Sequence, residues 1–184
     1  RVPTRHLMNR QDLRTVSREY FSDDRLAEHH FRSFNNFLGR GMQDVVDEKE
    51  RIETDIGDKE GQEPVYVELG DVRMVTPRVR EADGSEELLY PQEARLRNIT
   101  YSAPVFMEMS IVRGGEDEPE TVVDSTETKV GRMPVMVGSD KCNMAGFSDE
   151  ELIDIGEDPV DPGGYFIVNG SERVLMTSED LAPN

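Results

Sequence analysis

The sequence predicts an α+β fold, in which N-terminal helices over residues 17–55 precede a mostly antiparallel, β-rich part over residues 64–184. The first observation behind this prediction is a change of period. Apolar residues recur at three- and four-residue steps up to Leu38 and at two-residue steps from Val65 onward. The second observation is that turn signals such as Asn169-Gly170 separate short apolar runs in the second part. Helices followed by hairpins are typical of an α+β domain.

The chain is predicted to open with an N-terminal extension over residues 1–16, because helical periodicity becomes clear only from Ser17. Met8 is a candidate start of the natural chain, and we hypothesise that residues 1–7 are not native. Ser17 is predicted to cap the first helix, and Ser22-Asp23-Asp24 is predicted to begin a second one.

The second predicted helix has one apolar face. This face comprises Leu26, His30, Phe31, Phe34, Phe37 and Leu38. The helical spacing of its phenylalanines favours core packing over a base-stacking array. Gly39 and Gly41 are expected to break or kink the helix, and a further helix is expected to carry Met42, Val45, Val46 and Ile52. His29 and His30 should diverge by about 100° on a helix, so we expect no metal site there.

Strands are predicted where apolar residues alternate, over residues 65–75, 105–112 and 129–137. A polar link over residues 56–63 precedes the first of them. Ala82-Asp83-Gly84-Ser85 is expected to form a turn, and Pro91 is expected at the first position of a short helix. Pro134 marks the last strand as an edge strand or a bulge, because proline cannot donate to a strand ladder.

Two acidic segments interrupt the apolar pattern. Residues 114–127 are predicted to be a solvated loop at a hairpin tip, because they lack the ligand spacing of a calcium-binding EF-hand loop. Residues 149–158 are predicted to form a short acidic helix or a turn.

The last stretch reads as a turn followed by a hairpin. Pro162-Gly163 suits the centre of a type II turn, and residues 165–168 suit a strand. Asn169-Gly170 favours a type I′ turn, which needs positive φ at both central residues. Residues 174–176 are the predicted returning strand, which leaves Glu172 and Arg173 just past the turn.

The chain is strongly acidic, since it has 39 acidic and 21 basic residues and a formal net charge of −18. The acids are spread along the chain, which favours a protein of a salt-accumulating halophile over an acidic tail or a nucleic-acid mimic. Cys142 is the single cysteine, so a disulfide within the chain and a cysteine-based metal site are not expected. No apolar run approaches the roughly 20 residues of a membrane span, and we expect a cytoplasmic protein.

Residues 161–175, Asp-Pro-Gly-Gly-Tyr-Phe-Ile-Val-Asn-Gly-Ser-Glu-Arg-Val-Leu, resemble a signature segment of the second-largest, beta-type subunit of multisubunit DNA-directed RNA polymerase. Residues 90–98, Tyr-Pro-Gln-Glu-Ala-Arg-Leu-Arg-Asn, are similar to a second segment of the archaeal and eukaryotic members. A third resemblance lies at Gly131-Arg132-Met133-Pro134. Together with the acid excess, these segments indicate the N-terminal protrusion region of a haloarchaeal subunit.

The resemblance implies a role in transcription without catalysis by this segment. The protrusion is expected to wall the DNA cleft and to support the RNA–DNA hybrid and the upstream DNA. Nucleotidyl transfer belongs to the assembled enzyme, whose Mg²⁺ is bound by another subunit, and the isolated segment is expected to be inactive. The implied partners are the rest of its own subunit, the other polymerase subunits, DNA, the hybrid and initiation factor B.

The resemblance also singles out side chains near nucleic acid. Arg173 is the predicted phosphate contact, with Glu172 beside it, and Ser178 stands where many eukaryotic relatives have glutamine. For three further arginines, structural pairing is favoured over a nucleic-acid contact. They are Arg95, Arg97 and Arg132.

Two other functions compete with this interpretation. The first is a free-standing acidic β-rich protein-binding module, and the second is a small hydrolase that uses its many carboxylates. The sequence contains no Walker-type phosphate loop, no Gly-x-Ser-x-Gly elbow and no metal-ligand cluster, so no catalytic residue and no metal ligand is predicted.

Overall fold

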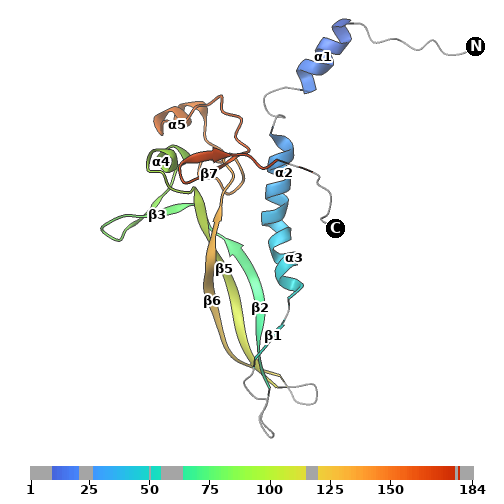
Figure 1. The fold of residues 1–184 in the computed structure, drawn as a ribbon, viewed down its shortest axis with the longest axis vertical. Helices are drawn as coiled ribbons and strands as arrows, with labels where there is room; N and C mark the ends of the chain where they lie inside the picture. Colours follow the sequence, from blue (N-terminus) through green and yellow to red (C-terminus); the bar gives the residue numbers. More distant parts are fainter. Residues whose placement is uncertain are drawn as a thin grey trace, which may run out of the picture.

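Most of the helical structure lies in the N-terminal third of the chain (Figure 1). The computed structural model describes residues 10–20, 27–49, 51–54, 64–114, 120–176 and 178. The helices are α1 (Arg10–Tyr20), α2 (Glu28–Asn36), the π-helical turn η2 (Phe37–Gly41), α3 (Met42–Asp47), α4 (Pro91–Leu96) and α5 (Asp149–Asp154). The predicted helix start at Ser22-Asp23-Asp24, the link over residues 56–63 and the hypothesis about residues 1–7 lie outside the described residues.

The first helix begins earlier than predicted. Ser17 lies inside α1, so its predicted role as a cap is wrong. Leu13, Val16 and Tyr20 follow one another at helical steps, and this period already covers part of the predicted extension over residues 1–16.

The two glycines do not interrupt the second helix. Gly39 and Gly41 lie in η2, and the flanking residues Asn36 and Met42 keep right-handed helical angles, so the helix is continuous from α2 to α3. A glycine costs a helix only about 1 kcal/mol. Burial of the neighbouring apolar residues offsets this cost, since Leu38 and Met42 pack against the core.

The main sheet has four antiparallel strands in the order β1-β2-β5-β6. They are β1 (Arg51–Glu53), β2 (Val65–Met74), β5 (Ser102–Arg113) and β6 (Thr121–Pro134). Figure 1 shows the long β5–β6 hairpin reaching away from α4 and β7, with α3 beside β2. The α+β fold class is confirmed, and β6 is an edge strand as predicted.

Two segments of the main sheet differ from the prediction. Ile52 belongs to β1 and not to a helix, because it pairs with Val67 and because Arg51 forms an ion pair with Glu68 at 3.0 Å. The loop predicted over residues 114–127 is wrong for residues 121–127, which belong to β6 and pair with β5. The β-branched residues that open β6 favour a strand despite the acids among them.

A bulge interrupts β2 between Leu69 and Val72. The side chain of Gln43 on α3 occupies the gap. It accepts a hydrogen bond from the Val72 amide at 2.9 Å and donates one to the Gly70 carbonyl at 3.4 Å. A single side chain therefore satisfies the backbone groups that the bulge leaves free and ties α3 to the sheet.

The remaining strands form two short hairpins. They are β3 (Arg78–Arg80) with β4 (Glu86–Leu88), and β7 (Phe166–Val168) with β8 (Ser171–Arg173). The predicted turn at residues 82–85 joins the first pair, and Pro91 is the first residue of α4 as predicted. The returning strand predicted over residues 174–176 is wrong, because β8 ends at Arg173.

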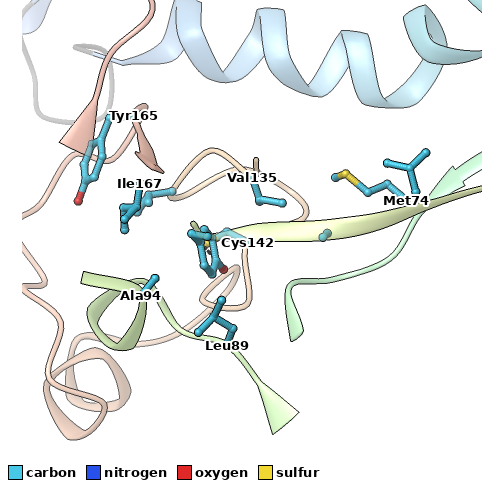
Figure 2. Close-up of a cluster of buried hydrophobic side chains, with 11 residues drawn as sticks. Met74, Leu89, Ala94, Val135, Cys142, Tyr165 and Ile167 are labelled. Carbon is cyan, nitrogen blue, oxygen red and sulfur yellow. Dashed lines mark hydrogen bonds between the residues drawn. The ribbon is translucent and has the colours of Figure 1, made fainter. Parts of the chain in front are cut away.

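The core lies where α4, the start of β5 and β7 meet (Figure 2). Tyr101, Ala94 and Ile167 are fully buried there, and Ile167 and Val135 belong to the same cluster, which Figure 2 shows. Phe34 on α2 is buried and meets Phe166 edge-on at 5.4 Å between ring centroids. Core packing is thereby confirmed for Phe34, whereas Phe37 is 41% exposed.

Candidate nucleic-acid interface

The β7–β8 hairpin carries the predicted nucleic-acid residues and rests on the segment after α4. Asn169 and Gly170 at its tip have φ values of 51° and 74°, which confirms the predicted type I′ turn. The Gly170 amide donates to the Ile99 carbonyl at 3.1 Å, and the Asn169 amide donates to the Thr100 hydroxyl at 3.1 Å. These bonds fix the tip against residues 99–100, so the hairpin is a defined part of the fold.

Arg173 is the last residue of β8, and its side chain is exposed. No hydrogen bond or ion pair joins its guanidinium to any residue that the structure describes. Ser178 is also exposed and lies among the described residues beyond β8. The described part of the chain therefore leaves the Arg173 side chain available for a further contact, and its role at nucleic acid stays a prediction.

An apolar groove with a volume of about 750 Å³ opens beside Arg173. Among the described residues, those that line the groove come from α2, η2, β6, β7, β8 and the segments after β6 and β8, and none of these residues is Asp or Glu. In a chain with 39 acidic residues, it is electrostatically distinctive that the described part of this surface carries no acid next to Arg173. The groove is bordered by the exposed residues Val174, Leu175 and Met176.

His29 and His30 also line the groove, and their ring centroids are 4.0 Å apart. The prediction that the two side chains diverge is wrong, because the two rings lie against each other at the start of α2. Burial, with a smaller effect from His29, lowers the pKa of His30. Within the described ranges, no group of three or more His, Cys, Asp or Glu side chains could hold a metal ion.

Glu172 lies next to Arg173 in sequence but is bonded within the protein. Its carboxylate meets the Nε atom of Arg95 at 2.9 Å. Consecutive residues of a strand point to opposite faces. Glu172 therefore faces α4, while Arg173 faces the groove.

Arg95 on α4 is the centre of a polar cluster, and its side chain is 19% exposed. Its guanidinium meets Glu157 at 3.0 Å and donates to the Tyr165 hydroxyl at 2.5 Å, with Asp161 at 3.8 Å. Burial disfavours the charged arginine, but the bonds to Glu157 and the field of Tyr165 outweigh it and raise the pKa of Arg95. The cluster therefore holds a fixed positive charge within a set of acceptors.

Glu157 gives this cluster its rigidity. Its side chain is 4% exposed, and besides Arg95 it accepts a hydrogen bond from the Gln92 amide in the first turn of α4. A carboxylate at that position satisfies a helix N–H group and suits the positive end of the helix dipole. Sequence reasoning missed Glu157, because it lies 65 residues after Gln92 and no local motif marks it.

The other two arginines also have partners within the chain. Arg97 forms ion pairs with Glu81 and Glu93, both at 2.6 Å. Arg132 donates to the Ser102 hydroxyl and carbonyl, at 3.0 and 2.7 Å, and to the Arg78 carbonyl at 2.9 Å. Of the predicted arginines, Arg173 is thus the one that stays without a partner among the described residues.

Comparison with known proteins identifies the family. The sequence model of the family described as RNA polymerase beta subunit matches residues 25–183. The chain belongs to the RNA polymerase beta subunit family.

Three similar relatives are archaeal RNA polymerase subunits. The chain is 83% identical to DNA-directed RNA polymerase subunit Rpo2N of Halobacterium salinarum over 177 residues, which are 96% of the chain and 34% of that relative. It is 45% identical to Rpo2N of Methanocaldococcus jannaschii over 175 residues, 94% of the chain and 33% of the relative. It is 44% identical to Rpo2 of Saccharolobus solfataricus over 170 residues, 92% of the chain and 14% of the relative.

These matches confirm the predicted identification with the N-terminal region of the second-largest polymerase subunit and its archaeal, halophilic type. The chain spans about a third of the length of the Rpo2N relatives. Among its described residues, no helix is long and apolar enough to cross a membrane.

Proposed function

We propose that this RNA polymerase beta subunit segment is the protrusion, which walls the DNA cleft and supports the RNA–DNA hybrid and upstream DNA without supplying a catalytic group. In this proposal the assembled polymerase is the nucleotidyltransferase, its Mg²⁺ is held by another subunit, and the enzyme works in the cytoplasm. The observation that carries the proposal is the contrast between Arg173 and its neighbours. Arg95, Arg97 and Arg132 are engaged within the fold, whereas Arg173 is exposed and unpaired among the described residues.

Arg173 acts in this proposal by neutralising a phosphate. An arginine at a phosphate positions the nucleic acid without reading its sequence, which suits an enzyme that transcribes any template. The absence of carboxylates among the described residues that line the groove beside Arg173 supports this role, because carboxylates at that place would repel the phosphate backbone.

The test is the replacement Arg173→Glu in the assembled polymerase. We expect elongation complexes to dissociate several-fold faster, and the difference should be larger at low salt, because phosphate contacts weaken as salt rises. The measurement is complex lifetime over a series of KCl concentrations.

The matched control is Arg113→Glu, which changes the net charge equally at the far end of β5. Elongation complexes of the Arg113→Glu enzyme should last as long as those of the unaltered enzyme. If Arg173→Glu leaves the lifetime unchanged at every salt concentration, Arg173 is not a nucleic-acid contact.

The proposed partners are the rest of the same subunit, the other polymerase subunits and initiation factor B. The exposed apolar side chains of Val174, Leu175 and Met176 beside the groove support packing against the rest of the subunit, since the Rpo2N relatives are about three times as long as the matched part. The competing function is a free-standing binding module. A reading frame that continues beyond the codon for Asn184 favours the polymerase subunit, whereas a stop codon there favours the module.

A further inference from the structure

We propose that Arg95 is a positioning residue for Arg173 and that Glu172 is the link through which it acts. This inference rests on the proposed contact between Arg173 and a phosphate. It assigns the ion pair between α4 and β8 a function in holding nucleic acid, in addition to its place in the fold.

The first step is that the guanidinium of Arg95 has a fixed orientation. Its Nη1 atom lies 3.0 Å from Glu157, and its Nη2 atom lies 2.5 Å from the Tyr165 hydroxyl. Tyr165 in turn donates to Asp161. A guanidinium is a planar fork with rigid donor directions. Once both terminal nitrogens are held, the direction of the Nε–H bond is fixed as well.

The second step is that Nε–H points at the hairpin. It donates to Glu172 Oε1 at 2.9 Å. Of the three residues of β8, Glu172 is the one whose side chain bonds to another described residue. The hairpin has only three residue pairs, so its own ladder holds β8 weakly, and this ion pair fixes the middle of the strand.

The third step connects Glu172 to Arg173. The two side chains leave the strand on opposite faces, so a strand held at Glu172 presents Arg173 toward the groove. Arg173 has no bonded partner of its own among the described residues, so the backbone of β8 sets its direction. Loss of the link at Glu172 leaves β8 held by its pairing with β7 and by the tip alone, which loosens the end of the strand and spreads the positions of the Arg173 guanidinium.

Simple electrostatics predicts the opposite effect, which makes the inference testable. Glu172 is a carboxylate beside the proposed phosphate contact, and its side chain is 56% exposed. If it were only a neighbouring charge, its removal would strengthen the binding of nucleic acid. If it positions Arg173, its removal weakens binding.

The experiment compares Glu172→Ala with Glu172→Gln in the assembled polymerase. Both changes remove the charge, but glutamine keeps an oxygen that accepts the Nε–H bond of Arg95. We expect elongation complexes of Glu172→Ala to dissociate several-fold faster than those of the unaltered enzyme. Complexes of Glu172→Gln should persist at least as long as those of the unaltered enzyme. If both variants lengthen the lifetime equally, the positioning role is overturned.

A double variant tests whether Glu172 acts through Arg173. The combination Glu172→Ala/Arg173→Ala should behave like Arg173→Ala alone, because a positioning residue has no effect once the residue it positions is absent. Additive losses would contradict the inference. If Arg173→Ala itself has no effect, the proposed function fails; if Arg173→Ala shortens the lifetime and Glu172→Ala does not, only the positioning role fails.

A third comparison tests Arg95 directly. Arg95→Lys keeps the charge but cannot bond Glu157, Tyr165 and Glu172 together, so it should behave like Glu172→Ala. The control is Arg97→Lys, since Arg97 bonds Glu81 and Glu93 and not the hairpin. If the Arg95→Lys enzyme assembles and the lifetime of its elongation complexes is unaltered, the role of Arg95 is contradicted. If Arg95→Lys does not assemble, the comparison of Glu172→Ala with Glu172→Gln decides.

Discussion

Arginine residues of the same sequence neighbourhood have different roles in this fold because their surroundings differ. Arg95 and Arg97 are two positions apart around the end of α4, yet Arg95 is enclosed by Glu157 and Tyr165 while Arg97 joins two surface carboxylates. Hydrogen bonds to Glu81 and Glu93 raise the pKa of Arg97. Both arginines stay charged, and their charges are neutralised locally, so neither adds a net positive field to the groove.

At the residue scale, the buried carboxylate of Glu157 should contribute most to the Arg95 cluster. The change Glu157→Gln removes the charge that faces Arg95 and weakens the cap on the Gln92 amide. Hydrogen bonds to charged groups contribute about 1.5–3 kcal/mol, so we expect a loss of about 2 kcal/mol in the free energy of unfolding. Denaturant titration measures this loss. Glu93→Gln, on the exposed side of α4, should cost less, and equal losses would contradict the special role of Glu157.

At the element scale, the β7–β8 hairpin depends on a glycine at its tip. Gly170 has a φ of 74°, and an added Cβ would lie 2.8 Å from Cα of Asn98. Gly170→Ala should therefore lower the free energy of unfolding by more than about 1 kcal/mol, because both the backbone angle and the available space oppose the side chain. The control is Gly131→Ala in β6, where a Cβ meets nothing within 4 Å. Similar unfolding midpoints for the two variants would show that the tip does not rest tightly on Asn98.

Elements with local determinants could be predicted from the sequence, and those with distant determinants could not. The turn at Asn169-Gly170 and the start of α4 at Pro91 depend on the backbone preferences of their own residues. The strand at Ile52 depends on pairing with Val67, and the continuity of α2 and α3 depends on packing against the core. Local periodicity predicts neither the pairing with Val67 nor the packing of the helix against the core.

The same division applies to the candidate site. The hairpin that carries Arg173 was marked by its turn residues and by the resemblance to the polymerase subunit. No local feature of the sequence marks Arg95 as the partner of Glu172, because the two residues lie 77 positions apart. A contact between distant segments needs the fold, and here it adds a bond within the protein to the predicted place of Glu172 near nucleic acid.

At the scale of the whole molecule, charge repulsion and ion pairing respond to salt in opposite directions. Salt weakens exposed ion pairs such as that between Arg73 and Glu127. Salt also screens the repulsion among acidic residues, which exceed the basic ones by 39 to 21. Because 18 carboxylates have no basic counterpart in number, repulsion should dominate the response.

The chain should therefore unfold at a higher temperature as KCl rises. The Debye length falls from about 10 Å at 0.1 M to roughly 3 Å at 1 M, so most of the gain should appear within this range. Circular dichroism melts at a series of KCl concentrations measure the effect, and melts in sucrose of equal osmolality are the control, because sucrose does not screen charge. A midpoint that is insensitive to KCl, or that rises equally in sucrose, would show that the acid excess does not limit the stability of this fold.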